Sequence, residues 1–392
     1  MPTVPLLPRF RRLLGHPGAA PAGIAALMIL VMVAGYLARP TTAPGDAGPR
    51  AILDHWRIRA DVPAAVMAVQ RADGTRWVGA SGTLLRNGGG AVTPAARFRI
   101  ASITKLFVAT VVLQLAQENQ LAVTDTLDRF MPAFPGAGGI TVGQLLGHTS
   151  GVPDYGVIEG FTSRLLKDRG QRFTNEQVLS LVADRKRDFP PGTDYAYSNS
   201  GYILLAEVIA AVTHDTWAAQ VRRRILNPLQ LTDTYIAGTE PASAPVIPGY
   251  FDTDNDGTEE NIETGQSWPS LETSEGAAGA IVSTAADLAT FGDALYHGRL
   301  LNAGTLQTMT APHPHHPRNT NYGYGTEIIR LGYETTVLGH GGFLPGFKSL
   351  LWYVPSRDLT IAVLTNDSTA NPADLAELIL RHHQPTRGVA PF

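Results

Sequence analysis

The chain of 392 residues contains no cysteine. Disulfides, a thiolate nucleophile and cysteine-ligated metal sites are therefore excluded. Charged residues make up only 17%, and the formal net charge is −3, so the sequence lacks the basic surplus of nucleic-acid-binding proteins. Hydrophobic residues make up 44%, which is enough to build a packed core. The composition indicates a globular protein that has no nucleic acid among its partners.

The first 38 residues contain one long run without charge. Three of the first 12 residues are arginines, and residues 19–37 are then uncharged. This length is close to the ~20 residues that span a bilayer as a helix. Since only Arg39 follows closely, the positive-inside rule places residues 1–18 in the cytoplasm and the body of the chain outside. We expect residues 19–38 to be a transmembrane signal anchor; a cleaved signal peptide and an ordinary buried helix are the alternatives.

The rest of the chain divides into a linker, one large domain and a short tail. Residues 39–49 are rich in Pro, Gly and Thr and have no means of building a core, so we expect a linker there. Residues 50–384 carry the apolar patterns of a folded domain, and residues 385–392 remain as a tail. Within the domain, we expect a helical insert at about residues 121–275.

Strand patterns occur near both ends of this domain. Apolar runs at 64–70 and 76–82 flank an Ala-Asp-Gly turn and predict a β-hairpin, and residues 104–120 have helical spacing. Two later helices and four later strands are expected, at 284–296 and 372–383, and at 322–329, 335–339, 348–354 and 360–365. The pattern predicts an α/β (α+β) fold, in which one sheet is assembled from both ends and an all-helical subdomain lies beside it.

The first candidate site is Ser102-Ile103-Thr104-Lys105. Spacing of i and i+3 puts Ser102 and Lys105 on the same face of a helix. A serine hydroxyl becomes a nucleophile when a base removes its proton, and a lysine can do this when burial lowers its pKa. The N-terminus of the following helix favours developing negative charge. Taken alone, S-x-x-K is a weak signal, and the alternative is that Ser102 is merely an N-cap before the helix.

The second candidate site is Tyr197-Ser198-Asn199, which follows a Pro-Pro-Gly turn. A tyrosine acts as a general base only when a cation holds its phenolate near neutral pH, and Lys105 is a candidate for that cation. Asn199 is a candidate to orient Lys105 and to bind a substrate amide. The alternative is a buried tyrosine with a satisfied hydroxyl.

The third candidate site is His340-Gly341-Gly342-Phe343, at or in a strand. Two glycines beside a polar residue let a substrate approach the backbone closely. The N–H groups of Phe343 and Ser102 would together form an oxyanion hole. The alternative is a glycine-rich edge strand with a structural histidine.

These S-x-x-K, Y-x-N and H-x-G motifs, in this order, resemble those of the serine β-lactamase and penicillin-binding-protein superfamily. The chain looks most like the branch of class C β-lactamases, DD-carboxypeptidases and family VIII esterases. Residues 145–151, LLGHTSG, are similar to the LLxHTSG segment of that branch. Residues 276–284, GAAGAIVST, followed by Asp287, are similar to its GGxxST..D segment. The resemblance covers about residues 50–384.

The resemblance implies a β-lactamase/transpeptidase-like fold, with an antiparallel sheet flanked by helices and the site between the sheet and an all-helical region. Ser102 would be acylated, and Lys105 and Tyr197 would share proton transfer. Asn199 would hold Lys105 and the substrate. His340 would replace the lysine of the third motif, as it does in some DD-peptidases, D-aminopeptidases and esterases.

The third motif departs from the family pattern at Gly341. Family members that grip a C-terminal carboxylate usually have Thr or Ser at this position. A hydrogen bond to a charged group is worth roughly 1.5–3 kcal/mol, so its loss weakens both a tight DD-carboxypeptidase and an efficient β-lactamase. The resemblance therefore favours a peptidase or an esterase over a β-lactamase.

One acidic segment has a calcium-loop pattern. Asp252, Asp254, Asp256 and Gly257, with Glu263, fit D-x-[DN]-x-[DN]-G-x5-E. No clear helices flank the segment, so a solvated acidic hairpin tip is the alternative. Calcium is the one cofactor that the sequence suggests.

The expected function is that of an exported serine hydrolase that forms an acyl-enzyme on Ser102. Its substrate would be a small D-amino-acid peptide, as in a DD-carboxypeptidase-like enzyme, an ester or a peptidoglycan-like molecule. The alternative is a β-lactam or muropeptide sensor that does not turn over, although about 18 cytoplasmic residues are few for signalling. The protein is expected at the cell membrane with its catalytic domain outside the cytoplasm, or secreted if the signal is cleaved.

Overall fold

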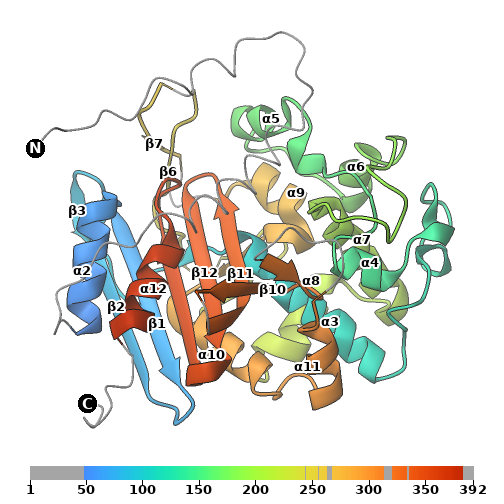
Figure 1. Cartoon of the computed structure of the whole chain (residues 1–392). Coiled ribbons are helices and arrows are strands. Elements are labelled where there is room, and N and C mark those ends of the chain that lie inside the picture. The colour runs from blue at the N-terminus through green and yellow to red at the C-terminus, as the bar shows by residue number, and fades with distance from the viewer. Residues whose placement is uncertain are drawn as a thin grey trace, which may run out of the picture.

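The apolar runs near the two ends of the domain pair with one another in an eight-stranded antiparallel sheet (Figure 1). The computed structural model describes residues 48–242, 244–254, 256–262, 267–312, 320–332 and 335–382. The predicted anchor at 19–38, nearly all of the linker, the tail and Glu263 lie outside these residues. Among the described residues, no helix is both long enough and apolar enough to cross a membrane.

The order of strands in the sheet is β3-β2-β1-β13-β12-β11-β10-β9. Ala65 of β1 pairs with Thr365 of β13, so the first and last strands of the domain lie side by side at the centre. The prediction of one sheet assembled from both ends is confirmed. The eight strands are β1 (Ala64–Arg71), β2 (Arg76–Leu85), β3 (Gly88–Ala91), β9 (Thr320–Tyr322), β10 (Glu327–Leu331), β11 (Thr335–Leu344), β12 (Phe347–Val354) and β13 (Leu359–Thr365).

Both faces of the central strands are covered by helices. Met67 and Val69 of β1 share a core with α2 (Pro49–Ala60) and α12 (Pro372–His382) on one face. Val66 lies in the larger core on the other face, where α10 (Ala285–Tyr296) packs against the sheet. Because neither face meets water, the central strands read as continuous apolar runs rather than as alternating patterns.

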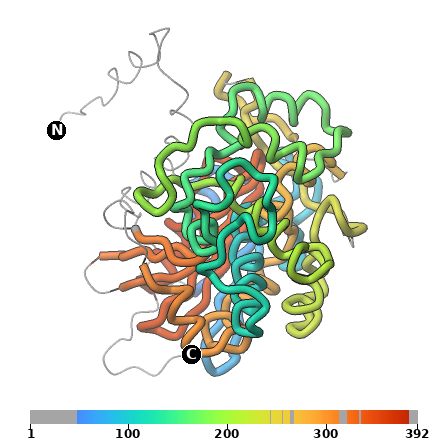
Figure 2. The backbone as a smooth tube through the Cα atoms, turned by 90° about the vertical axis from the view of Figure 1, so that its right-hand side faces the viewer, coloured from blue at the N-terminus to red at the C-terminus, as the bar shows by residue number. Residues whose placement is uncertain are grey.

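The remaining helices gather beside the β9–β11 end of the sheet (Figures 1 and 2). Capping boxes begin two of them, because Thr141 and Gln144, like Thr174 and Gln177, exchange side-chain and backbone hydrogen bonds. These helices are α3 (Thr104–Gln117), α4 (Val142–Leu146), α5 (Phe161–Lys167), α6 (Asn175–Ser180), α7 (Asn199–Thr213), α8 (Trp217–Val221), α9 (Pro269–Gly279) and α11 (Ala303–Met309).

Short strands join the helical region to the segment that contains Ser102. In a three-stranded sheet, β4 (Phe98–Arg99) and β5 (Tyr235–Ile236) flank β8 (Ile281–Ser283). A separate hairpin pairs β6 (Tyr250–Phe251) with β7 (Glu260–Asn261). Two or three residues are too few to show a period, so the sequence did not predict these strands.

The single strand predicted at 322–329 is wrong, because two strands, β9 and β10, occupy this region. Gly323 N–H donates to the Thr326 carbonyl at 2.8 Å, and Gly325 has φ 75°, so the chain turns between them. A Cβ at Gly325 would lie 2.4 Å from the Cβ of Ala109 on α3. The turn therefore packs this end of the sheet directly against α3.

Candidate active site

Ser102 lies in a tight turn between β4 and α3. Ala101–Ile103 form one 3-10 turn, and α3 begins at Thr104 with Ile103 as its N-cap residue. Ser102, which is partly exposed, is therefore not the helix cap, and its hydroxyl is available for other contacts. The preceding residue, Ala101, has φ 50°, a left-handed conformation that costs a non-glycine residue about 1 kcal/mol. Such strain is concentrated at functional sites.

Three oxygens surround the Nζ atom of Lys105, which is fully buried. The distances from Nζ are 2.7 Å to Asn199 Oδ1, 2.8 Å to the Ala278 carbonyl and 3.1 Å to Ser102 Oγ. Amide and carbonyl oxygens can only accept hydrogen bonds. In the neutral amine, the two N–H groups therefore donate to Asn199 Oδ1 and to the Ala278 carbonyl. The nitrogen lone pair is left to accept the hydroxyl proton of Ser102.

Burial lowers the pKa of Lys105 to about 7. The carboxylates of Glu275, Asp154 and Glu327 act in the opposite direction and raise this pKa, but burial has the larger effect. A sizeable fraction of Lys105 is therefore neutral near pH 7, as a general base requires.

Tyr197 contacts the same hydroxyl from the other side. Its phenol donates to Ser102 Oγ at 2.8 Å. Burial raises the pKa of Tyr197 well above its ordinary value of 10, although the hydrogen bond with Ser102 lowers it. The sequence suggested that Lys105 could hold Tyr197 as a phenolate. Because Lys105 does not offset the rise in the Tyr197 pKa on burial, the resting form of Tyr197 is the neutral phenol. Tyr197 is a proton donor at rest, and Lys105 is the proton acceptor.

Asp154 holds Asn199 in place at the start of α7. Asp154 Oδ1 accepts the Asn199 backbone N–H, and Oδ2 accepts the Asn199 side-chain amide, both at 3.2 Å. The amide oxygen of Asn199 is then left to face Lys105. Sequence reasoning missed Asp154, which comes three residues after the LLGHTSG segment, because a single acidic residue in a loop has no distinguishing pattern.

His340 is fully buried in β11 and carries no charge. Its Nε2 accepts the hydroxyl of Tyr322 at 2.9 Å, and its Nδ1–H donates to the Gly341 carbonyl. Burial lowers the pKa of His340 to about 3. The position where the resemblance implies a lysine in other family members is therefore neutral in this protein.

Strand β11 passes directly over the turn that contains Ser102. A Cβ at Gly342 would lie 2.3 Å from the Ile100 carbonyl and 2.2 Å from Ser349 Oγ, so only glycine fits there. The pairing of β11 with β10 ends at Gly339, so residues 340–344 have no partner on that side among the described strands. N–H groups of alternate residues point the same way in a strand. Since Gly341 N–H points to Glu327 on that side, the N–H of Phe343 does too, as an oxyanion hole requires.

Glu327 places a carboxylate at this open edge. Its Oε2 accepts the Gly341 N–H at 3.3 Å, and its Oε1 lies 3.9 Å from His340 Nδ1. Its side chain is 16% exposed, and burial raises its pKa to about 7. Sequence reasoning missed Glu327 and Glu275, because a glutamate in a strand or helix is usually a surface residue.

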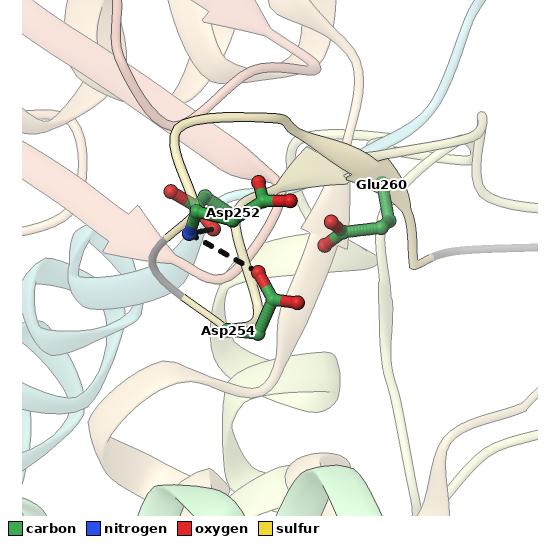
Figure 3. A group of neighbouring side chains, drawn as sticks. Asp252, Asp254 and Glu260 are labelled. Carbon is green, nitrogen blue, oxygen red and sulfur yellow. Dashed lines mark hydrogen bonds between the residues drawn. The ribbon is translucent and has the colours of Figure 1, made fainter.

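The acidic segment forms a cluster in the β6–β7 hairpin (Figure 3). One carboxylate oxygen each from Asp252, Asp254, Asp256 and Glu260 lies within 4.8 Å of the others. Glu260 completes this cluster, whereas Glu263 of the sequence pattern lies outside the described residues. Oxygens of this type suit Ca²⁺, but those of Asp252 also accept N–H groups of their own loop, as at a hairpin tip. The calcium loop stays a prediction.

Comparison with known proteins places most of the chain in one family. The family described as Beta-lactamase matches residues 45–384. Penicillin-binding protein 4 of Amycolatopsis lactamdurans is 29% identical over 351 residues, which are 81% of this chain and 86% of the relative.

Two similar solved structures are those of amide hydrolases. A D-stereospecific amidohydrolase from Streptomyces sp. is 31% identical with a TM-score of 0.74, over 84% of this chain and 97% of the other. The D-amino acid amidase of Ochrobactrum anthropi SV3, in complex with L-phenylalanine amide, is 26% identical with a TM-score of 0.75, over 86% and 98%. These structures confirm the predicted antiparallel sheet flanked by helices.

Proposed function

Because the chain belongs to the beta-lactamase family of serine hydrolases, we propose that it hydrolyses amide or ester bonds of D-amino-acid derivatives through an acyl-enzyme on Ser102. The observation that carries the proposal is the contact between Ser102 Oγ and a lysine amine whose other two contacts are acceptors. The D-stereospecific amidohydrolase and the D-amino acid amidase support this substrate class.

Acylation begins when neutral Lys105 takes the proton of Ser102. Ser102 Oγ then attacks the substrate carbonyl carbon, and the new C–O bond places the negative charge on the carbonyl oxygen. The N–H groups of Ser102 and Phe343 stabilise this oxyanion. The bond to the amine or alcohol breaks as the leaving group receives a proton from Tyr197, which Lys105 replenishes. One leaving group departs, and both residues return to their starting protonation states.

Deacylation repeats these steps with water in place of the serine. Lys105 removes a proton from the water, directly or through Tyr197, and the oxygen attacks the ester carbon of the acyl-enzyme. The bond to Ser102 breaks, and Ser102 Oγ regains the proton. The product is a free carboxylic acid, and the enzyme is regenerated.

The third motif limits which substrates fit this site. Neutral His340 and hydroxyl-free Gly341 provide no cation and no hydroxyl for a substrate carboxylate. We therefore place D-amino-acid amides and esters ahead of β-lactams and of peptides that end in D-alanine. A DD-carboxypeptidase-like activity would be the slower one.

We also propose that the domain acts outside the cytoplasm. The three arginines within the first 12 residues and the uncharged run at 19–37 support a signal anchor. Small D-amino-acid derivatives are accessible to an enzyme in the cell envelope.

The proposed function is tested with matched chromogenic substrates. D-Alanine p-nitroanilide and p-nitrophenyl acetate should be hydrolysed, and the D-anilide should exceed its L-isomer by at least about tenfold in kcat/KM. Ser102→Ala should lose at least about 1,000-fold in kcat on every substrate while its melting temperature stays unchanged. Equal rates for the two isomers would contradict the D-specific proposal, and normal turnover by Ser102→Ala would contradict the acyl-enzyme.

A further inference from the structure

The LLGHTSG segment at residues 145–151 places a buried histidine against the proton donor Tyr197. His148 is only 1% exposed. Its ring centroid lies 4.3 Å from that of Tyr197, and the two ring planes are tilted by 37°. The rings of Tyr322 and Tyr202 pack near the same imidazole, with centroids at 4.7 and 5.4 Å. The steps of acylation and deacylation make no use of His148.

Two hydrogen bonds join His148 to the chain on either side of Tyr197. The Ser198 backbone N–H donates to His148 Nδ1 at 3.2 Å, and the Ala196 N–H donates to the His148 carbonyl at 3.1 Å. Tyr197 is therefore held through both of its neighbours in the chain. Because the Tyr197 phenol donates to Ser102 Oγ at 2.8 Å, a shift of this short segment would change that contact.

The same segment holds the other side chain of the Y-x-N motif. Asp154 Oδ1 accepts the Asn199 N–H at 3.2 Å, just as His148 Nδ1 accepts the N–H of the preceding residue, Ser198. Ser198 is the N-cap residue of α7, and its own side chain makes no capping hydrogen bond. The first N–H groups of a helix have no partner within the helix. Two side chains from one segment therefore accept the two N–H groups that follow Tyr197.

The backbone of His148 adopts the conformation that these contacts require. Its φ is 58°, a left-handed value that is unfavourable for residues other than glycine. In this conformation both the ring and the carbonyl of His148 meet the Tyr197 segment. Strain of this kind is concentrated at functional sites, and Ala101 beside the nucleophile has the same left-handed φ, at 50°.

We propose that His148 is a positioning residue for the proton donor. By accepting the Ser198 N–H, it fixes the backbone next to Tyr197 and keeps the phenol aimed at Ser102 Oγ. The inference rests on the proposed function, in which Tyr197 protonates the leaving group. Removing the acceptor of His148 should therefore slow the release of leaving groups that need a proton more than the release of those that do not.

Two variants separate the acceptor of His148 from its ring. His148→Phe keeps an aromatic ring and removes the acceptor. His148→Asn loses the ring and keeps an acceptor, because Asn Oδ1 and His Nδ1 are both bonded to Cγ, and asparagine tolerates a left-handed backbone. The readout is kcat/KM for D-alanine p-nitroanilide divided by kcat/KM for p-nitrophenyl acetate. Both values come from the same active sites, so any unfolded fraction cancels from this ratio.

In His148→Phe the anilide-to-ester ratio should fall at least about tenfold. The amine of p-nitroaniline leaves only with a proton from Tyr197, whereas p-nitrophenolate leaves without one. The loss on the anilide should lie in kcat, with KM within about threefold of the wild-type value, because substrate binding is not affected. His148→Asn should keep the ratio within about threefold of wild type. An unchanged ratio in His148→Phe, or an equal fall in His148→Asn, would overturn the assignment to the Nδ1 acceptor.

Tyr202→Phe is the matched control for a loosened core. The buried Tyr202 hydroxyl donates to the Leu146 carbonyl at 3.1 Å, and its ring packs near the same imidazole. This variant loses one buried hydrogen bond without changing the acceptor at Ser198, so its ratio should stay within about threefold of wild type. A fall equal to that in His148→Phe would show that any loss of packing here has the same effect, and the positioning role would be overturned.

A double-mutant cycle tests whether His148 acts through Tyr197. In the Tyr197→Phe background, His148→Phe should lower kcat/KM for the anilide by less than about threefold, because no phenol is left to position. A further loss of tenfold or more would contradict the proposal. If the wild type hydrolyses both substrates through Ser102 but the ratio does not respond to His148→Phe, only the positioning role is wrong. If Ser102 supports hydrolysis of neither substrate, the proposed function and the positioning role both fall.

Discussion

At the scale of single residues, two oxygens decide what Lys105 can do. Asn199 Oδ1 and the Ala278 carbonyl take two of its N–H groups, and Ser102 stands at the third position. A lysine that kept its proton would be a third donor facing the serine. Because burial lowers the pKa of Lys105 to about 7, the amine is neutral in a large fraction of the molecules near pH 7. In those molecules the nitrogen lone pair, not an N–H group, faces Ser102.

The pH dependence of a neutral ester should report this group. Only neutral Lys105 accepts the serine proton, so kcat/KM for p-nitrophenyl acetate should rise with pH through a midpoint near 7, the pKa of Lys105. Initial rates between about pH 5 and pH 9 measure it. A profile that is flat across this range would contradict a role for Lys105 as the base.

Glu275→Gln should move that midpoint to lower pH. The Glu275 carboxylate raises the pKa of Lys105, so removing its charge lowers this pKa and lets the amine become neutral in more acidic solution. The exposed Glu176 on α6 provides the control Glu176→Gln, which changes net charge equally but should leave the midpoint in place. A shift to higher pH in Glu275→Gln would contradict the electrostatic account.

Tyr197→Phe should lower kcat by about 100- to 10,000-fold, because it removes the phenol that donates to Ser102 Oγ and protonates the leaving group. The matched control is Tyr155→Phe, since the buried Tyr155 hydroxyl also donates at 2.8 Å, but to the Ser274 carbonyl. Both variants should unfold at similar urea concentrations, and the control should keep most of its turnover. Comparable kcat values in the two variants would show that the Tyr197 hydroxyl is not needed for proton transfer.

At the scale of helices and strands, the sequence predicted the residues that form the acyl-enzyme site better than those that tune it. Ser102 and Lys105 share a motif with fixed spacing, and the structure brings them to Tyr197 and Asn199. Glu327 reaches the site only because β11 extends past the end of β10. That overhang depends on the turn at Gly323–Thr326, whose two-strand geometry the apolar pattern did not reveal.

The turn between β9 and β10 can be tested with two glycines. Gly325 and Gly332 both have positive φ, so alanine is strained at either position. At Gly325 a Cβ would also lie 2.4 Å from Ala109, whereas at Gly332 it would meet nothing within 4 Å. Gly332→Ala should cost about 1 kcal/mol and Gly325→Ala about 3 kcal/mol of unfolding free energy in urea. Equal losses would contradict the close contact between this turn and α3.

At the scale of the whole molecule, the predicted topology holds because one sheet needs strands from both ends of the domain. β1 pairs with β13 over seven residues, so the sheet is complete only when both ends of the domain are in place. Between residues 121 and 275, where we expect a helical insert, the described residues form α4 to α8 and also β5, β6 and β7. Two-residue strands are fixed by their partners rather than by their own sequence, which is why local patterns miss them.

The proposed export can be tested on the N-terminal residues alone. Residues 1–50 fused to alkaline phosphatase should give an active reporter, because this enzyme needs the oxidising space outside the cytoplasm to form its disulfides. The reporter should sediment with membranes if residues 19–38 are an anchor and stay soluble if they are a cleaved signal. An inactive but intact reporter would contradict export. Replacing the three N-terminal arginines with glutamate is the control for orientation.

The measurement that tests the central claim most directly is intact-mass spectrometry of the enzyme after rapid acid quenching. Wild type and Ser102→Ala are mixed with a D-alanine ester for a fraction of one turnover and then compared. We predict that the wild type gains the mass of one D-alanyl group, which digestion of the quenched enzyme locates on the peptide that contains Ser102, and that Ser102→Ala gains none. An acyl group on another residue, or hydrolysis at the wild-type rate by Ser102→Ala, would contradict the acyl-enzyme on Ser102.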